Sequence, residues 1–205
     1  MRPLPRVHAF TDEDLLSSPD FGIRTAAIAA AGPAVALHVR ARTSAAVLSA
    51  GAVRMMALAR PPEAAVFVNG RPDIAAAVGA HGVQLGTEDL SPADARRLLP
   101  RAWVGRSVHS MEEASTAVAE GADFLVAGNI FETESHPDRP AVGLDLISRA
   151  ARLGRPVIAI GGITPDRVHE VEAAGAYGVA AIRALWMAPD PAAATLAMLL
   201  PWTAT

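Results

Sequence analysis

PVIAIGGITPDRV, which runs from Pro156 to Val168, combines a short apolar run, two glycines and the start of a helix. The uninterrupted apolar run Val157–Ile160 is typical of a strand buried on both faces, as in a parallel sheet. Gly161 and Gly162 carry no Cβ, so backbone N–H groups there can come close to a ligand, and Thr164-Pro165 is a typical helix start. Amides at the positive end of a helix bind anions, most often phosphate. A plain strand-to-helix turn is the alternative interpretation.

The alternation of strand and helix extends outward over the whole chain, because eight apolar runs of strand length each precede a segment of helical length and period. The expected strands are 6–10, 34–39, 65–68, 82–85, 103–106, 123–127, 156–160 and 177–182, and the expected helices are 14–31, 44–59, 72–78, 91–99, 111–120, 143–153, 165–173 and 190–200. Eight such units predict a (β/α)8 TIM barrel that forms a single domain over residues 1–205. A doubly wound open sheet is the alternative, but it usually has five or six strands.

Two local features support this division into units. The motifs Gly79-Ala80-His81, Gly121-Ala122-Asp123 and Gly175-Ala176-Tyr177 share one form, in which glycine caps a helix and the chain turns into a strand. One connection, from Asn129 to Val142, is much longer than the others and follows the sixth strand. Loops of this length at the C-terminal face of a barrel are typical of lids over an active site.

The composition restricts the chemistry that the chain can perform. It has no Cys, which excludes disulfides, thiolate nucleophiles and zinc–thiolate sites. It also has no Lys, so all 18 basic residues are Arg and a Schiff base cannot form. The groups left to carry protons are the six His, the carboxylates and Tyr177.

Charge and hydropathy indicate which partners to expect. The formal net charge of −3 gives no reason to expect nucleic acid or an anionic membrane as a partner. No apolar run reaches the roughly 18 residues needed to span a bilayer, and the N-terminal stretch turns acidic where a signal peptide would be apolar. We therefore expect a cytoplasmic protein with a small-molecule ligand, no nucleic acid and no membrane partner. A homo-oligomer is left open.

The second strand ends in residues that suit an anionic ligand. A period of two places His38, Arg40 and Arg42 on one face, opposite Leu37 and Val39. Two arginines that point into the mouth of a barrel would be costly without an anion, so we expect a phosphate or carboxylate there. A salt bridge at the rim is the alternative.

Polar residues also follow the other strands, at the end where barrel enzymes place their sites. They are Asn69 and Arg71, Asp89, Ser107 and His109, Asn129, Thr133 and His136, and Arg183, which the apolar Ile182 precedes. Asp89 could bind Mg²⁺ or simply cap the next helix. His109 could be only a turn residue, because Ser110 and Glu113 form a capping box. Ile182 and Arg183 lie in the loop region where barrels commonly bind phosphate, next to the predicted glycine turn.

These residues resemble the thiamine phosphate synthase superfamily, and within it the thiazole tautomerase (TenI-like) branch. The resemblance covers nearly the whole chain, and its motifs are HVRAR (38–42), VNGRPD (68–73), GRSVHS (105–110), FET (131–133) and VIAIGGITP (157–165). In the synthase branch, which joins a pyrimidine diphosphate to a thiazole phosphate with Mg²⁺, the pattern has Gln, Lys, Asp, Asp and Lys at positions 38, 42, 70, 89 and 136. This chain has His38, Arg42, Gly70, Asp89 and His136 there.

The resemblance therefore implies a tautomerase, an isomerase that aromatises a carboxythiazole phosphate by a proton shift without a metal or other cofactor. We expect Gly161, Gly162, Ile182 and Arg183 to hold the phosphate, and Arg40 and Arg42 to act as clamps for an anionic group of the substrate. The remaining substrate contacts that the resemblance implies are Asn69, Arg71, Ser107 and Thr133. The synthase is the alternative function, and Mg²⁺ with Asp89 as its ligand is expected only under that alternative.

One position departs from the tautomerase pattern. Those enzymes carry a catalytic His after the glycine of the sixth strand, and this chain has Asn129, which cannot transfer protons at ordinary pH. The candidates to replace it are His136, His38 and His109, and Glu132 could serve only if burial raised its pKa. Asn129 is also the main argument for a third alternative, a non-catalytic relative that binds a phosphate ligand.

Overall fold

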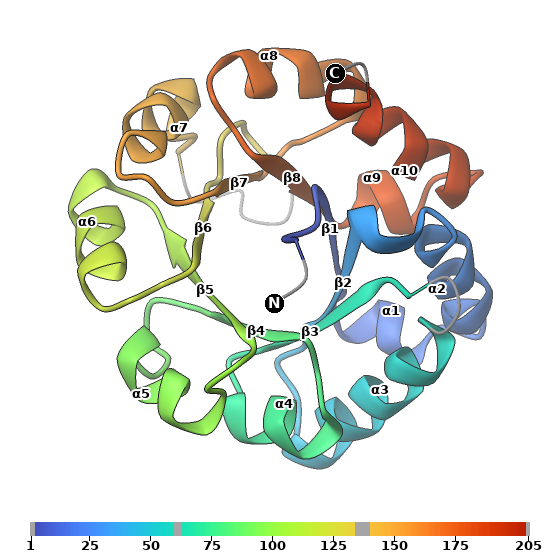
Figure 1. Cartoon of the computed structure of the whole chain (residues 1–205). Coiled ribbons are helices and arrows are strands. Elements are labelled where there is room, and N and C mark those ends of the chain that lie inside the picture. The colour runs from blue at the N-terminus through green and yellow to red at the C-terminus, as the bar shows by residue number, and fades with distance from the viewer. Residues whose placement is uncertain (1–2, 60–62, 134–139, 204–205) are drawn as a thin grey trace.

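Eight parallel strands close on themselves in chain order, so that β8 pairs with β1 as well as with β7 (Figure 1). The computed structural model describes residues 3–59, 63–133 and 140–203. Its strands are β1 Val7–Phe10, β2 Val35–Val39, β3 Ala65–Asn69, β4 Gly82–Leu85, β5 Trp103–Val108, β6 Phe124–Ala127, β7 Val157–Ile160 and β8 Gly178–Ala181. The predicted (β/α)8 barrel is confirmed, and closure between the first and last strands excludes the open sheet.

The helices form a ring around the barrel (Figure 1). They are α1 Glu13–Ser17, α2 Phe21–Ala29, α3 Ala45–Leu58, α4 Pro72–Val78, α5 Pro92–Leu98, α6 Met111–Ala119, α7 Gly143–Ala151, α8 Val168–Ala173, α9 Arg183–Trp186 and α10 Pro191–Leu199, with 3-10 turns η1 Gly32–Ala34, η2 Pro165–Arg167 and η3 Leu200–Trp202. The single helix expected over 14–31 is two helices, because Ser18 is extended before Pro19 and ends α1. The helix expected over 165–173 begins as a 3-10 turn, and the Thr164 side chain makes no capping hydrogen bond.

The three Gly-Ala motifs end helices as predicted. Their glycines adopt left-handed φ angles of 68°, 88° and 99°, which a side chain disfavours. In each motif the alanine amide bonds back to a carbonyl five residues earlier, and the third residue pairs with the preceding strand. The alanine bonds are Ala80 to Ala75 at 2.9 Å, Ala122 to Ala117 at 3.0 Å and Ala176 to Val171 at 3.2 Å.

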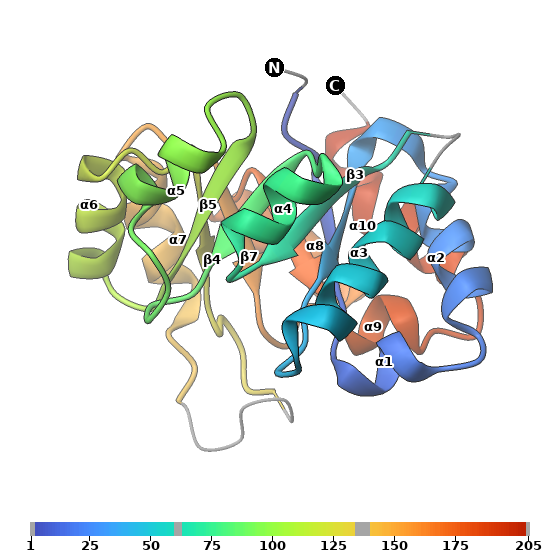
Figure 2. The ribbon, with the colours of Figure 1, turned by 90° about the horizontal axis from the view of Figure 1, so that it is seen from below.

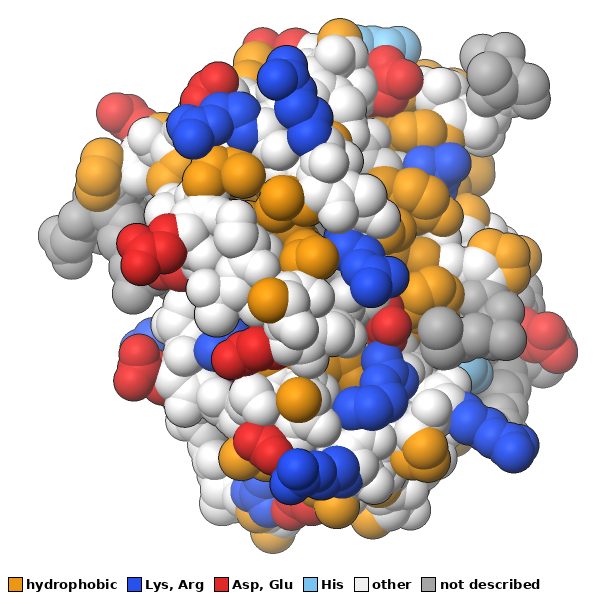
Figure 3. All heavy atoms as spheres, turned by 60° about the vertical axis from the view of Figure 1, so that its left-hand side comes forward, with side chains coloured by type: hydrophobic (Ala, Val, Ile, Leu, Met, Phe, Trp, Pro, Cys, Tyr) orange, Lys and Arg blue, Asp and Glu red, His pale blue; other side chains and the backbone are white. Residues whose placement is uncertain are grey.

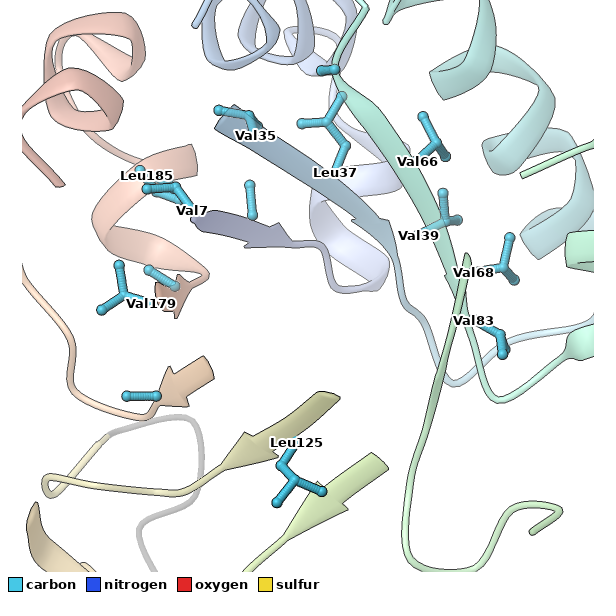
Figure 4. Packing of buried hydrophobic residues seen from close by; sticks show 14 of the residues in the cluster. Val7, Val35, Leu37, Val39, Val66, Val68, Val83, Leu125, Val179 and Leu185 are labelled. Carbon is cyan, nitrogen blue, oxygen red and sulfur yellow. The ribbon is translucent and has the colours of Figure 1, made fainter. Parts of the chain in front are cut away.

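Alternate residues of each strand enter two separate cores. One set points outward to the helices, as Figure 4 shows for Val35, Leu37, Val66 and Val68. The other set fills the barrel lumen and consists of Leu4, Phe10, Ala36, Ala65, Phe67, Phe124, Val126, Ile158 and Ala180. Because both faces of a strand are buried, its sequence reads as an unbroken apolar run.

The lumen is closed at the end opposite the C-terminal mouth of the barrel. Leu4 is buried there, and the Tyr177 hydroxyl donates a hydrogen bond of 2.7 Å to the Leu4 carbonyl. Figure 2 shows this N-terminal segment on the upper side of the barrel, with the described residues that follow β6 and precede α7 on the lower side. The C-terminal ends of the strands therefore lie on the lower side, away from Leu4.

The outer surface is mixed in charge on the side that faces left in Figure 1. Figure 3 shows acidic and basic side chains interspersed there, with no broad area of a single sign. A search of the helices in the described ranges finds none long and apolar enough to cross a bilayer.

Large lumen residues fit only because glycines lie on the neighbouring strands. A Cβ on Gly105 would lie 2.2 Å from Phe124 Cζ, and one on Gly82 would lie 2.3 Å from Phe67 Cε1. Neither aromatic ring can move aside easily, because both are fully buried. The glycines therefore act here by their small volume.

We expect Gly105→Ala to lower the free energy of unfolding by about 1–3 kcal/mol, the usual result of overpacking a core. Gly22→Ala is the matched control, because a Cβ there would meet only Arg54 Nη2 at 3.5 Å, and alanine in a helix is favoured over glycine by up to about 1 kcal/mol. Urea unfolding measures both changes. Equal stability of Gly105→Ala and the unmodified chain would contradict this packing.

Candidate functional site

A cavity of about 540 Å³ opens at the C-terminal ends of β6, β7 and β8. Six residues predicted from the sequence line it, and they come from three separate loops. They are Asn129, Thr133, Gly161, Gly162, Ile182 and Arg183. Thr164 and Arg167 also line the cavity, and sequence reasoning did not select them as ligand contacts.

The two glycines are built into the wall of this cavity. Gly161 and Gly162 have φ angles of 97° and 64°. A Cβ on Gly161 would lie 2.2 Å from Asn129 Cβ, and one on Gly162 would lie 2.7 Å from the Glu132 carbonyl oxygen. The loop after β6 therefore packs against the glycines in the space that side chains would fill.

The carbonyls and the amides of these two glycines differ in their hydrogen bonding. The Gly161 carbonyl accepts from the Phe131 amide at 3.1 Å, and the Gly162 carbonyl accepts from Arg167 Nη1 at 2.9 Å. Within residues 3–59, 63–133 and 140–203, neither glycine amide donates to a protein acceptor. Two N–H donors at the cavity wall therefore remain for an anion.

Charged side chains of both signs surround these donors. Arg183 and Arg167 line the cavity together with Glu132 and Asp166. The Arg167 guanidinium lies 4.5 Å from the centre of the Phe131 ring, which holds it at the cavity wall. The signal that could have found Arg167 is its place in the first helical turn after the glycines.

The two arginines that follow β2 differ in their environment. The Arg40 side chain is half-buried, and burial, followed by the charge of Arg42, lowers the pKa of its guanidinium. Its guanidinium makes no hydrogen bond to the part of the chain that the structure describes. Arg42 is exposed, and its backbone amide is bonded to the Glu13 carboxylate. Arg40 is therefore the better placed of the two to hold a ligand.

Other predicted residues lie outside the cavity. The Arg71 guanidinium donates two hydrogen bonds to the Asp73 carboxylate, from Nε to Oδ1 at 2.8 Å and from Nη2 to Oδ2 at 2.5 Å. Both side chains are exposed. His109 Nδ1 lies 3.1 Å from Glu113 Oε2, which also accepts from the His109 amide at 2.6 Å. His109 thus belongs to the start of α6. His136 lies outside the described residues.

Asp89 lies on the loop after β4, directly opposite Gly70. Its Oδ2 atom accepts from the Gly86 amide at 2.6 Å, and a Cβ on Gly70 would lie 3.2 Å from each of its carboxylate oxygens. Arg106 holds this loop by donating to the Thr87 and Leu90 carbonyls, each at 3.0 Å. The Asp89 carboxylate is therefore held at the rim, next to the end of β3.

Two histidines and an asparagine form a hydrogen-bonded line inside the barrel. His8 Nδ1 lies 2.8 Å from His38 Nε2, and His38 Nδ1 lies 3.2 Å from Oδ1 of the Asn69 side chain. Both histidines are fully buried, and burial lowers the pKa of His8 to about 4. Burial, followed by the charge of His8, lowers the pKa of His38 well below its usual value. Sequence reasoning missed His8, although a period of two along β1 gives it the same face as Phe10.

A second polar pair lies one strand further on. Gln84 Nε2 donates to Ser107 Oγ at 3.0 Å and to the Leu85 carbonyl at 3.2 Å. Gln84 Oε1 is buried and has no hydrogen-bond partner among the described residues. Ser107, which was predicted, is thus oriented by Gln84, which was not.

Comparison with known proteins places the chain among enzymes of thiamine biosynthesis. Residues 7–185 match the family model described as thiamine monophosphate synthase. A thiamine-phosphate synthase of Koribacter versatilis is 37% identical over 204 residues, or 96% of each chain, and one of Thermus thermophilus is 46% identical over 147 residues, or 71% of each. A solved thiamine phosphate pyrophosphorylase from Pyrococcus furiosus is 32% identical, with a TM-score of 0.80 over 94% of this chain and 93% of that one.

These comparisons confirm the resemblance to the superfamily and correct the choice of branch. The expectation of a tautomerase, and hence of an isomerase, is wrong, because the relatives at 37–46% identity are named thiamine-phosphate synthases. That expectation depended on a few positions, among them Gly70, and on two short motifs. Identity over most of the chain is the broader evidence.

The buried histidines predict a loss of stability in acid. The unfolded chain binds a proton at His8 near pH 6.5 and the folded chain only near pH 4. The contribution of His8 is therefore complete above pH 6.5 and is lost as the pH falls from 6.5 toward 4, by about 2–3 kcal/mol between pH 7 and pH 4.5. The lowered pKa of His38 likewise makes the folded chain lose stability as the pH falls.

Urea unfolding at pH 7 and pH 4.5 measures this loss, and variants separate it from the titration of carboxylates. His8→Phe should lose less stability between the two pH values than the unmodified chain does. His169→Gln, which changes an exposed histidine, should lose as much as the unmodified chain. The same loss in His8→Phe and in the unmodified chain would show that His8 does not titrate in this window.

Proposed function

We propose that this chain, which belongs to the thiamine monophosphate synthase family, is itself a thiamine-phosphate synthase that joins a pyrimidine diphosphate to a thiazole phosphate. The observation that carries the proposal is 37% identity to a synthase over 96% of both chains. The cavity at the strand ends adds physical support, because it combines amide donors with arginines.

The reaction makes a definite demand on the protein. A bond forms between the two ring systems, and the carbon–oxygen bond to the diphosphate breaks. The diphosphate leaves with the electron pair, so negative charge increases on it in the transition state. Cationic and N–H groups fixed around the leaving group stabilise that charge, and a site closed to water strengthens their effect.

The cavity between β6 and β8 suits the phosphate of the thiazole substrate. The Gly161 and Gly162 amides are donors at its wall, and Arg167 and Arg183 bring positive charge to it. Arg40 directly follows β2, which is separated from β8 by β1 alone. We propose that Arg40 and Arg42 meet the diphosphate, because arginine binds such groups through two parallel N–H donors.

Magnesium is the metal that the family implies, and one carboxylate of this chain suits it. Asp89 faces Gly70, a position that adds no second carboxylate. Within the described ranges, no group of three or more His, Asp or Glu residues could hold a metal. Proteins commonly hold Mg²⁺ through one or two carboxylates together with substrate phosphates. Asp89 would therefore share the ion with the diphosphate, and the bound ion would neutralise part of the diphosphate charge.

Incubation with both substrates and Mg²⁺ tests the proposal directly. We expect thiamine phosphate and free diphosphate to appear in equal amounts, which chromatography of the mixture measures. Absence of product at every Mg²⁺ concentration would overturn the synthase function. Tight binding of thiazole phosphate in the same samples would then identify a phosphate-binding relative that has lost the reaction.

Asp89→Asn tests the single-carboxylate metal site. Asparagine can still accept from the Gly86 amide but carries no charge, so we expect the Mg²⁺ concentration for half-maximal rate to rise roughly tenfold, or about 1.4 kcal/mol. Glu88→Gln is the control, because it removes the neighbouring exposed carboxylate. An equal rise in both variants, or none in Asp89→Asn, would argue against Asp89 as the ligand.

A further inference from the structure

The line of buried polar groups that ends at Asn69 has a fixed starting point. His8 Nε2 lies 3.1 Å from the Pro5 carbonyl oxygen, and His8 Nδ1 lies 2.8 Å from His38 Nε2. His38 stacks on Phe10 and Phe67, with ring centres 3.9 and 4.9 Å away. These rings fix the plane of the imidazole, and within that plane Nδ1 lies 3.2 Å from Asn69 Oδ1.

The Pro5 carbonyl sets the direction of every hydrogen bond in this line. A carbonyl oxygen only accepts, so His8 Nε2 must carry the hydrogen, and a neutral imidazole then has a bare Nδ1. His38 Nε2 must therefore donate to His8, which leaves His38 Nδ1 bare in turn. The opposite direction would place the lone pairs of His8 Nε2 and the Pro5 oxygen face to face. Both histidines stay neutral at pH 7, because burial lowers the pKa of each.

A bare Nδ1 on His38 also selects one orientation of the Asn69 amide. The contact at 3.2 Å involves the Oδ1 position of Asn69, but amide oxygen and nitrogen exchange places by a half-turn about the last side-chain torsion. Only the NH₂ group can donate to a bare ring nitrogen. Asn69 must therefore turn its NH₂ to His38 and its carbonyl oxygen away from it.

We propose that Pro5, His8 and His38 form a positioning chain that fixes Asn69 as a hydrogen-bond acceptor at the mouth of the barrel. Asn69 is the last residue of β3 and is half-buried, and the other end of its amide makes no hydrogen bond to any residue in the described ranges. A substrate group that meets Asn69 must then carry an N–H or O–H donor. A substrate with a carbonyl at that atom would be rejected, because two acceptors would face each other.

This inference rests on the proposed function in one respect, the identity of the substrate that meets Asn69. Gly70 follows Asn69 and faces Asp89, the proposed ligand of the ion shared with the diphosphate. The pyrimidine diphosphate is therefore the substrate on this side of the mouth. The thiazole phosphate lies on the opposite side, at the Gly161 and Gly162 amides.

The tautomers of the two histidines can be measured without any activity. Nitrogen-15 NMR of the intact chain at pH 7 distinguishes a protonated ring nitrogen from a bare one, and His8→Phe and His38→Gln assign the signals. We expect hydrogen on Nε2 and a bare Nδ1 in both histidines. Hydrogen on Nδ1 of either ring, or a charged imidazole, would overturn the positioning chain whatever the chain catalyses.

Kinetics of two variants at one position test the consequence for the substrate. His8→Phe removes the acceptor for His38 Nε2, so His38 and Asn69 lose their preferred orientation. We expect KM for the pyrimidine diphosphate to rise about tenfold and KM for thiazole phosphate to change less than twofold. His8→Asn keeps an acceptor at the Nδ1 position and should restore the KM for the pyrimidine diphosphate to within about threefold.

Two outcomes would show that His8 has only a structural role. One is an equal loss in His8→Phe and His8→Asn, and the other is a parallel rise of KM for both substrates. If His8→Phe does not fold, the NMR measurement on the unmodified chain still decides the inference. If no synthase activity is found, the same measurement still tests the positioning chain, so the two failures are distinguishable.

Discussion

Closure of the barrel is the constraint on which the other features of this protein depend. A closed parallel sheet has no free edge, and each strand sends half of its side chains into a lumen of fixed volume. Phe67 and Phe124 fill that volume because Gly82 and Gly105 leave room for their rings. Leu4 closes one end, so the open end is the place where polar groups can meet a ligand.

The same constraint applies to polar atoms in the lumen, because a buried polar group without a partner is costly. His8 and His38 satisfy each other, and their line of hydrogen bonds runs from the Pro5 carbonyl to Asn69. A packing requirement deep in the barrel is thereby transmitted to the orientation of a side chain at the mouth. The family pattern has Gln at position 38, and in this chain a histidine pair provides the buried polar contact.

The mouth shows how a family member can keep a fold while its charged residues change. Arg42 stands where the family pattern has lysine, and arginine keeps its charge and binds phosphate groups with a fork of donors. Gly70 leaves Asp89 without a second carboxylate at that position, so the proposed magnesium ion would take more of its ligands from the substrate. These differences favoured a tautomerase when the motifs were compared one by one, whereas identity to synthases extends over the whole chain. The glycine pair at Gly161 and Gly162 is compatible with either reaction, since both substrates carry a phosphate.

The sequence by itself determined the eight strand–helix units, the glycine caps and the glycine pair after β7, because each depends on residues within a few positions of one another. It did not show that His8 meets His38, that Gly105 makes room for Phe124, or that Arg167 lies against Phe131 at the wall of the cavity. Most of these contacts join residues on different strands or loops, and they exist only once closure and register bring those elements together. The end of α1 before Pro19 could also have been predicted from local sequence, because proline disfavours a helical conformation in the residue before it. The long helical pattern over 14–31 led instead to the expectation of one continuous helix. Tertiary structure therefore decided which polar residues act together, since partners in a barrel are set by neighbouring strands and not by distance along the chain.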